Sequence, residues 1–578
     1  MTDATKETKG LLLLVASFAL VFIIAACTTE VIKEVPVEVI KTVEVVKEVV
    51  VEKVVEVEVI KEVAVETEVV KTVEIVKEVA VEVVVFATPV PAASLVAPSG
   101  QKYGGTIKIG VVDFGTMDPA LMGLSEGSNL YSELTYDNAI VTDYDGELMP
   151  WALESWSANA DASQYTLKVR QGITFHRGGE QNAKDIKFTF DRILDEATAS
   201  PLQGVIDFIT NIATPDDYTL VFDLEGPNAF LPGLLTDYHA RILPDGVTSE
   251  EITTGEYGAG AFILGEHNPA ERTVMHRNPN YWRIGYPFVD QVILFYMPEI
   301  TTRVEAIKSG AIDVVFDPGF GALDTLEANP NVIINEVASA GVRVLDFHTN
   351  REPFNNKNLR KAFQYAVNRD FVREAVLFGH GANANDHPVG TGDEYYWDEQ
   401  PIISQDIARA KEYLTLAGYP DGFDIVLHTT DMAEKLDMAL AFKESVAPAG
   451  IRVEVSNNDP TTYWEEFWMN ECCPFVASSW SGRPANQALD VQMRSGGVWN
   501  ESYYSNPRLD ELLDMANSQP DITLRKAYFQ EIQEILIEDV PVLYLMHTPV
   551  IVTHRSRMMD VRAHPRVETF IENWWISD

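Results

Sequence analysis

The residues of this chain that could carry out covalent or metal chemistry are few and scattered. Its three cysteines are Cys27 and the adjacent Cys472 and Cys473, too few for a disulfide framework. None of its 11 histidines lies at metal-ligand spacing from another, and no nucleophile elbow, zincin helix or phosphate-binding loop occurs. The turn Gly258–Ala261 lacks the lysine of a phosphate loop, so we interpret it as structural. The sequence therefore predicts a protein that is not an enzyme and that binds no cofactor or metal.

Some neighbouring side chains still need an interpretation. Asp393–Glu394 and Glu465–Glu466 are adjacent in the chain, and such neighbours do not face one common site, which argues against a glycosidase. An oxidised Cys472–Cys473 pair would form a strained ring; an oxidising compartment would permit it, but we expect two free thiols. His380 and His387 lie in a Gly-rich loop, where a part in binding a metal chelate stays open and a solvated or turn-stabilising role is expected.

The N-terminus has the pattern of an export signal followed by an anchor. Lys6 and Lys9 precede the apolar run Leu11–Ala26, which is short for a membrane span and typical of a secretory signal. The run ends in Ile-Ala-Ala-Cys, which resembles the bacterial lipobox and implies a signal peptide over residues 1–26 and diacylglycerol attachment to Cys27. Two acyl chains would anchor the protein stably. The alternative is an uncleaved span with an incidental cysteine.

Residues 27–85 form a stalk built mostly from Val, Glu and Lys. From residue 31 onward all 13 Glu lie at even positions and all 7 Lys at odd positions, and 20 of the 28 odd positions are Val or Ile. This period of two is typical of a β-strand, but the segment is far too long for one ordinary strand. Its length would suit a helix, although no heptad emerges. We predict a stalk of open conformation that could self-associate through strand edges, followed by a Pro/Ala/Ser linker over residues 86–102.

The net charge limits the partners of the protein. The whole chain carries −43; the stalk from residue 31 contributes −6, Glu30 contributes −1 and residues 1–29 sum to zero, which leaves −36 for the rest. A body this acidic binds nucleic acid poorly, because nucleic acids are polyanions.

From Tyr103 the composition becomes that of a mixed α/β protein. Alternating apolar residues predict strands, and apolar residues at helical spacing predict helices. The predicted strands are 106–111, 165–170 and 220–224, and the predicted helices are 183–194, 358–367, 407–417, 507–516 and 523–538. Because strands and helices are interspersed, we expect an α/β or α+β fold with several sheets.

Short phrases in a consistent order along the body carry a resemblance to a known family. They include YGGTIKIG from Tyr103, TMDPAL from Thr116, YTLKVRQGITFHRGG from Tyr165, TVMHRNPNYW from Thr273, FNNKNLRKAFQYAVNRD from Phe354 and YYSNPRLDELL from Tyr503. Together they resemble the extracytoplasmic solute-binding proteins of ABC importers, in the large peptide/nickel-type family 5 (cluster C). The resemblance extends from Tyr103 nearly to the C-terminus.

The resemblance implies an α/β fold of two lobes, of the type II periplasmic-binding-protein kind, which close on a ligand across a hinge. An extra domain is inserted in the first lobe. By that analogy lobe I comprises residues 103–134, 216–340 and 545–578, the inserted domain comprises 135–215, and lobe II comprises 341–544. A lipid anchor, a spacer and a large body also suit capture of a solute near a membrane, and hinge closure would bury the ligand while permitting its release.

The resemblance also indicates which residues line the cleft between the lobes. They lie in the loop after the first strand, in the turn that follows Ala477, and in the strand that returns to lobe I: Met122, Leu124, Ser125, Trp480, Ser481, Arg483 and Tyr544. Trp480 is expected to stack on the ligand, with core packing as the alternative. The other tryptophans that we considered are expected to pack in the core or on the surface: Trp464, Trp468, Trp499, Trp574 and Trp575.

Arg483 departs from the pattern of the peptide-binding relatives, in which an Asp in this turn pairs with the ammonium group of the ligand. An Arg fork binds a carboxylate or phosphate bidentately and repels an ammonium group. We therefore expect a ligand with an acidic group, or one held by stacking and neutral hydrogen bonds. The alternative is that Arg483 pairs with a neighbouring carboxylate of the protein.

These inferences predict a lipid-anchored receptor that captures a peptide or peptide-like solute and delivers it to an ABC permease. The protein would lie outside the cytoplasm, anchored to the cell membrane by Cys27. The alternatives are a structural or adhesive surface lipoprotein, a sensory receptor, and a family member that binds an oligosaccharide or a metal chelate.

Overall fold

The computed structural model describes residues 98–123, 125–432, 434–497, 499–566 and 568–577, together with the stretches 44–46, 49–51, 60–65 and 68–73. Cys27 and Leu124 therefore lie outside the described residues. Among the described residues no helix is both long enough and apolar enough to span a membrane.

The described stretches of the stalk are β-strands. β1 (Glu44–Val46) pairs with β2 (Val49–Val51), and β3 (Ile60–Val65) pairs with β4 (Glu68–Val73), both antiparallel. In the second hairpin Glu62 lies opposite Lys71 and Val63 opposite Val70. These stretches are thus extended in the structure, whereas the sequence left the conformation of the stalk open.

One sheet of 11 strands runs through both lobes. Its order is β12-β13-β14-β5-β15-β21-β16-β20-β18-β19, and β17 joins at β21. The first five strands belong to lobe I: β12 (Phe262–Asn268), β13 (Arg272–Arg277), β14 (Gln291–Tyr296), β5 (Thr106–Val111) and β15 (Val314–Phe316). The last strands belong to lobe II: β17 (Ala382–Asn383), β20 (Phe475–Trp480), β18 (Phe423–Thr430) and β19 (Ile451–Asn458).

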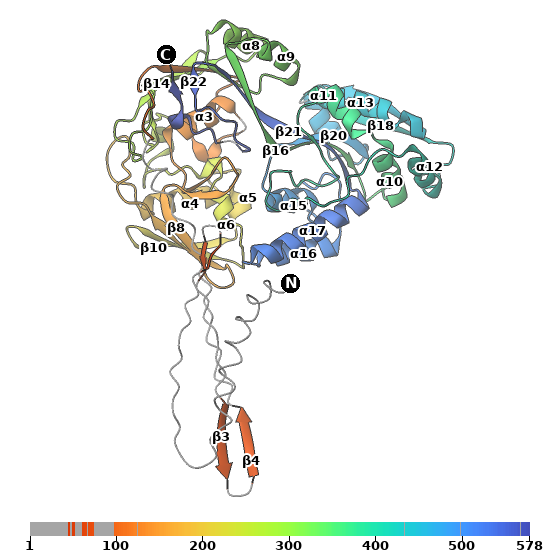
Figure 1. The fold of residues 1–578 in the computed structure, drawn as a ribbon, viewed down its shortest axis with the longest axis horizontal. Helices are drawn as coiled ribbons and strands as arrows, with labels where there is room; N and C mark the ends of the chain where they lie inside the picture. Colours follow the sequence, from red (N-terminus) through yellow and green to blue (C-terminus); the bar gives the residue numbers. More distant parts are fainter. Residues whose placement is uncertain are drawn as a thin grey trace, which may run out of the picture. The chain divides into compact units, whose positions relative to one another are not determined.

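The two lobes are joined by the long antiparallel strands β16 (Val332–Phe347) and β21 (Val542–Arg555), which lie at the centre of Figure 1. Their register shifts between the pairs Val337–Val550 and Gly341–Thr548, where β16 has more residues than β21. Such a bulge bends a strand locally. The shift lies where the strands pass from one lobe to the other, which is where the resemblance leads us to expect the hinge.

The inserted domain has its own four-stranded sheet, in the order β10-β11-β9-β8. Its strands are β8 (Leu153–Ala158), β9 (Gln164–Val169), β10 (Ile209–Asp216) and β11 (Thr219–Leu224). A hairpin of β6 (Ile140–Thr142) and β7 (Leu148–Pro150) precedes these strands in the chain. The hydrophobic core of this domain includes Ile242 and, further along the chain, Ala259, whereas Leu243 packs in the core of lobe I.

The predicted boundary between residues 215 and 216 is therefore wrong. β11 pairs with β9 and β10, so it belongs to the inserted domain and not to lobe I. The reason is that the pairing partners of a strand are not visible in its own alternation of residues, which predicts only that a strand is present.

The helices of lobe II gather around its part of the sheet, and Figure 1 shows α10–α13 around β18 and β20. They are α10 (Lys357–Ala366), α11 (Arg369–Leu377), α12 (Ile407–Leu416), α13 (Lys435–Val446), α14 (Pro460–Thr462), α15 (Ala485–Met493), α16 (Pro507–Asn517) and α17 (Ile522–Asp539). A π-helical turn covers Tyr463–Phe467. Four of the predicted helices lie here within two residues of their expected ends.

Shorter helices surround the other sheets. Lobe I has α3 (Glu126–Thr135), α7 (Ser249–Ile252), α8 (Ile300–Ser309) and α9 (Leu323–Glu327), and the inserted domain has α4 (Ala183–Leu194), α5 (Gln203–Ile206) and α6 (Leu231–Leu234). Short 3₁₀ turns cover Pro119–Leu121, Tyr238–Ala240, Phe320–Ala322, Ala447–Ala449 and Ile571–Asn573, and β22 (Met558–Met559) pairs with β23 (Trp575–Ile576).

The adjacent cysteines differ from expectation. Cys472 and Cys473 are joined by a disulfide in the structure, whereas two free thiols were expected. They follow a turn in which the Cys473 N–H donates to the carbonyl of Asn470, and this turn brings the two sulfurs together. The turn precedes β20 directly.

Candidate functional site

The turn with Trp480 and Arg483 lies against the hinge. β20 ends at Trp480, which pairs with Val342 of β16 immediately after the register shift. Two residues later a Cβ atom on Gly482 would lie 3.2 Å from the backbone nitrogen of Gly341, so a side chain there would crowd the hinge strand. The turn is held from the other side because Asp393 accepts the N–H of Ala485 at 2.9 Å.

The Arg483 guanidinium lies beside two neighbouring tryptophans. Its guanidinium carbon is 5.6 Å from the ring centre of Trp480 and 5.7 Å from that of Trp499, and the two ring centres are 6.2 Å apart. Among the described residues Arg483 makes no hydrogen bond or ion pair, and its Nε atom is buried without a partner. A buried donor without a partner costs about 1–3 kcal/mol. The arrangement therefore leaves a cationic fork for a group from outside the protein.

The opposite wall is the turn Asp237–His239, next to the inserted domain. His239 contacts the carbonyl of Met122 through Nε2 at 2.8 Å and the carboxylate of Asp237 through Nδ1 at 2.6 Å. Burial lowers the pKa of Arg483, while the charges of Asp237 and Tyr238 act in the opposite direction. Burial and the charge of Asp237 raise the pKa of Tyr238 to about 12. The structure thus brings Met122 and Arg483 to the same region through a turn that the sequence did not indicate.

The other predicted residues have internal partners or are open to solvent. Ser125 caps α3, donates to Asp113 Oδ1 at 2.9 Å and accepts the N–H of Gly115 at 2.9 Å. Tyr544 is buried and its hydroxyl donates to Gln492 Oε1 at 2.7 Å. Ser481 is exposed. That these residues contact the ligand stays a prediction.

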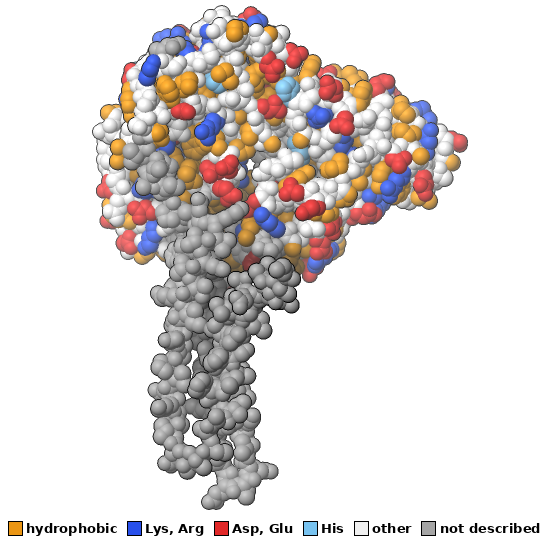
Figure 2. All heavy atoms as spheres, in the orientation of Figure 1, with side chains coloured by type: hydrophobic (Ala, Val, Ile, Leu, Met, Phe, Trp, Pro, Cys, Tyr) orange, Lys and Arg blue, Asp and Glu red, His pale blue; other side chains and the backbone are white. Residues whose placement is uncertain are grey.

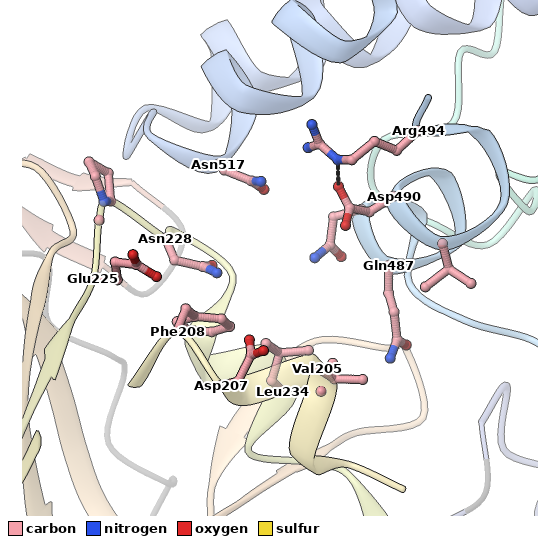
Figure 3. Close-up of a pocket in the computed structure, with 15 residues that line it drawn as sticks. Val205, Asp207, Phe208, Glu225, Asn228, Leu234, Gln487, Asp490, Arg494 and Asn517 are labelled. Atoms are coloured by element: carbon pink, nitrogen blue, oxygen red, sulfur yellow. Dashed lines mark hydrogen bonds and ion pairs between the residues drawn. The ribbon is translucent and has the colours of Figure 1, made fainter. Parts of the chain in front are cut away.

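A cavity of about 500 Å³ lies beside this turn, between the inserted domain and α15–α16. Figure 3 shows Asp207, Phe208, Glu225, Asn228 and Leu234 on one side and Gln487, Asp490, Arg494 and Asn517 on the other. The cavity adjoins the Arg483 site because Asn486 and Gln487 follow Arg483 closely in the chain, and Leu234 precedes Asp237.

The charged groups of the cavity are mostly acidic. Asp490 is paired with Arg494 at 2.6 Å, and Arg494 is also bonded to Asp514 at 2.9 Å. The carboxylates of Asp207 and Glu225 have no hydrogen-bond or ion-pair partner among the described residues. The Phe208 and Leu234 side chains add apolar surface. The lining therefore suits a polar or cationic group attached to an apolar body.

A buried polar cluster lies deeper in lobe II. Asp346 of β16 and Glu501 are 2% and 5% exposed, and burial together with their mutual proximity raises the pKa of Asp346 well above its usual range. Burial also raises the pKa of Glu501, whose Oε1 atom accepts the Trp468 N–H at 2.9 Å. Burial lowers the pKa of Lys435 to about 8. These groups are too deep to meet a solute, so we assign them to the interior of the lobe.

Neither of the candidate histidines belongs to a metal centre in the structure. His380 contacts Glu336 at 2.7 Å, and the buried His387 contacts Gln400 at 2.7 Å. Within the described ranges no three His, Cys, Asp or Glu residues are grouped so that they could hold a metal ion.

Gly258 is in the small-residue turn, where a Cβ atom would lie 1.8 Å from the carbonyl oxygen of Thr135.

Comparisons with known proteins agree with this architecture. The model of the "Bacterial extracellular solute-binding proteins, family 5 Middle" matches residues 147–500. The glutathione-binding protein GsiB of Pectobacterium atrosepticum is 24% identical over 473 residues, 79% of this chain and 91% of that protein. Di/tripeptide-binding protein 1 of Pseudomonas aeruginosa is 25% identical over 462 residues, 72% of this chain and 84% of that protein.

Solved structures share the fold. The ABC transporter-associated periplasmic binding protein DppA of Helicobacter pylori, in complex with the peptide STSA, has a TM-score of 0.69 at 24% identity and covers 82% of this chain and 99% of its own. HbpA2 of Haemophilus parasuis has a TM-score of 0.73 at 19% identity and covers 82% of this chain and 100% of its own.

These findings confirm the predicted two-lobed fold and the predicted class of function. Proteins of this kind capture a solute outside the cytoplasm and deliver it to an ABC importer, and they are not enzymes. Since the family model covers more than half of the chain, the chain belongs to the bacterial extracellular solute-binding proteins of family 5.

Proposed function

We propose that the protein binds a peptide or peptide-like solute whose acidic group is held by Arg483. The observation that carries this proposal is that Arg483 lies beside Trp480 and Trp499 without a hydrogen bond or ion pair among the described residues. Hydrogen bonds to charged groups are stronger than neutral ones, and an Arg fork matches a carboxylate in geometry. The expected alternative, an ion pair between Arg483 and a protein carboxylate, is absent from the described residues.

The rest of the ligand extends into the cavity beside α15. The free carboxylates of Asp207 and Glu225 favour a cationic group there, at the far end from Arg483. A zwitterion would satisfy both ends, and the names of two relatives, one binding glutathione and one binding di- and tripeptides, describe such ligands. Trp480 lies beside Arg483, and we expect the ligand also to contact Met122, Leu124, Ser125, Ser481 and Tyr544.

The N-terminal segment anchors the receptor. Cys27 carries diacylglycerol after removal of residues 1–26, residues 27–85 hold the body away from the membrane, and residues 86–102 link the two. The strand hairpins β1–β2 and β3–β4 leave strand edges through which stalks of neighbouring copies can pair. Replacing Cys27 with Ser should abolish labelling with a radioactive fatty acid; unchanged labelling would contradict the anchor.

Native mass spectrometry of the full chain tests the ligand proposal. A co-purified solute, or one selected from panels of peptides, oligosaccharides and metal chelates, should bind with an acidic group. Replacing Arg483 with Ala should weaken that binding by about 1.5–3 kcal/mol, or about 10- to 150-fold. Replacing Arg508 with Ala is the matched control, because Arg508 is paired with Glu531 and Glu511 on the surface. If the two variants bind the ligand with equal affinity, Arg483 is not part of the site. If no compound of any panel binds, the structural lipoprotein is favoured.

A further inference from the structure

The loop of residues 226–230, between β11 and α6, is a rigid projection of the inserted domain. The Asn228 N–H donates to the carbonyl of Ala162 at 3.0 Å, and the Tyr165 hydroxyl donates to the carbonyl of Asn228 at 2.8 Å. The Asn228 side chain in turn accepts the N–H of Phe230 at 2.9 Å. These bonds fix the position of the loop from within its own domain.

The tip of this loop contacts lobe II. The Ala229 N–H donates to the carbonyl of Asn517, at the end of α16, at 2.7 Å. The ring of Phe230 meets Phe529 at 6.0 Å and Tyr395 at 6.1 Å between centres, and both pairs are edge-to-face. Phe230 is thus an apolar side chain of the inserted domain that packs against a core cluster of lobe II.

The receiving surface is organised by lobe II itself. Tyr395 stacks on Phe529 with ring centres 4.3 Å apart, and the Tyr395 hydroxyl accepts the N–H of Arg525 Nε at 2.9 Å. Arg525 is held further by the carbonyls of Gln519 and Pro520 at 2.8 and 3.0 Å. Its guanidinium carbon lies 5.5 Å from the centre of the Phe230 ring. The socket for Phe230 is therefore built from residues that bond to one another and not to the loop.

We propose that Phe230 and this socket, formed by Tyr395, Arg525 and Phe529, are a latch that holds the inserted domain against lobe II. The latch bounds the cavity beside α15, because Asn228 and Asn517, the residues at the crossing point, also line it (Figure 3). Phe230 is a positioning residue: it sets the ratio of closed to open molecules, and a ligand held in the closed form gains or loses apparent affinity with that ratio. This role of Phe230 depends only on the two-lobed fold and not on which ligand the protein binds.

Loss of the Phe230 ring should shift this ratio measurably. Edge-to-face aromatic pairs and a cation–π contact of this kind together correspond to about a tenfold or larger change in an equilibrium constant. Replacing Phe230 with Ala should therefore increase the population of open molecules by about tenfold in the ligand-free protein. Replacing it with Tyr, which keeps the ring, should restore most of the closed population.

Amide hydrogen exchange in the full chain measures the population of open molecules directly. The Ala229 amide is bonded across to lobe II, whereas the Asn228 amide is bonded within the inserted domain, so the two neighbours report different events. In the Phe230→Ala variant the Ala229 amide should exchange about tenfold faster while the Asn228 amide is unchanged, and X-ray scattering should show a larger radius of gyration. Replacing Phe371, an exposed phenylalanine of α11 in lobe II, with Ala is the matched control and should change neither.

Two outcomes would overturn the latch. One is an unchanged Ala229 amide, and the other is faster exchange of both amides without a change in scattering, which would mean that the loop has loosened only locally. If the Phe230 variant fails to fold, replacing Arg525 with Met removes the cation from the socket and should raise Ala229 exchange in the same direction. Unaltered Ala229 exchange in that variant would also contradict the proposal. Because no ligand is used, failure here leaves the proposed function to its own test.

Discussion

Replacing Arg369 with Ala should destabilise lobe II strongly, because it would leave a buried carboxylate unpaired. Arg369 begins α11 and is 4% exposed, and its Nη2 atom lies 2.6 Å from Oδ1 of Asp386, which is fully buried. Arg369 also donates to the carbonyls of Tyr544 and Ile403 at 3.2 and 3.1 Å, and Asp386 accepts an N–H of Gln364 at 2.8 Å. One side chain thus ties α11, β21 and two loops together.

Removing one partner of a buried ion pair costs about 3–5 kcal/mol, since the remaining carboxylate either stays charged and unsolvated or must take up a proton. In a domain of the size of lobe II each kcal/mol lowers the melting temperature by about 2–4 °C, so a decrease of about 10 °C is expected. The assay is urea unfolding of the full chain followed by tryptophan fluorescence, with the midpoint compared at constant slope. A loss below about 1 kcal/mol would refute the reasoning.

Two further variants separate charge burial from simple loss of contacts. Replacing Arg508 with Ala makes the same chemical change at an exposed ion pair, where Glu531 lies 2.7 Å away, and should cost less than about 1 kcal/mol. Replacing Arg369 with Met and Asp386 with Asn together removes both charges and should recover a large part of the loss. Asn suits position 386 because the residue there has a positive φ of 62°.

Three other perturbations have defined outcomes. Burial lowers the pKa of His547 to about 3, so below about pH 6.5 the unfolded chain binds a proton at this residue that the folded chain does not bind. The free energy of unfolding therefore decreases as the pH falls. The variant His547→Gln should remove about 2 kcal/mol of that decrease between pH 7 and pH 5, measured by urea titrations. Gly258→Ala should cost at least about 3 kcal/mol or prevent folding, measured by thermal unfolding, because its Cβ atom would meet the Thr135 carbonyl. Intact mass should rise by two hydrogens when reductant opens the Cys472–Cys473 bond, and an unchanged mass would contradict the disulfide.

Local elements of the fold could be predicted well from the sequence. The helix expected over residues 183–194 has those bounds, because Asn182 and Asp185 form a capping box that marks its start. The helix expected over 507–516 starts as predicted, since Asn506 caps it and Pro507 occupies its first turn. β11 was recognised as a strand but assigned to the wrong domain, because its partner β9 lies far upstream in the sequence. Pairing between distant segments is decided by packing, which a local pattern does not contain.

The sequence could suggest a site residue where one residue type departs from a pattern, but not where residues meet only in space. Arg483 could be proposed because its charge is opposite to that of the residue expected at its place. Trp499, expected to pack in the core or on the surface, is 42% exposed and lies beside the Arg483 guanidinium, which its sequence context did not indicate. Asp237 and Tyr238 were missed because their turn carries no motif and reaches Arg483 only through the fold. Contacts between such distant segments form only when the chain folds, so a local sequence pattern does not predict them.

The excess of acidic residues makes it informative that Arg483 has no carboxylate partner among the described residues. The sequence has 87 acidic residues against 44 Lys and Arg, and Figure 2 shows acidic side chains spread over the visible face among basic and hydrophobic ones. In such a protein most arginines meet a carboxylate, as Arg343 does with Glu434 and Arg192 with Asp118. Arg483 meets none in the part of the chain that the structure describes, because two indole rings occupy its surroundings and the nearby Asp237 is bonded to His239.

This arrangement has a consequence for binding kinetics. The net negative charge of the body repels an anionic ligand at long range, and at physiological ionic strength this repulsion is screened beyond about 8 Å. In the proposed site Arg483 would act at contact distance, beside Trp480 and Trp499, where screening is weaker than at long range. Association of an acidic solute should therefore be slow and should quicken as salt is added, whereas its dissociation, governed by the contact with Arg483, should respond little to salt. A body that is acidic overall can in this way hold an acidic ligand tightly at one protected arginine.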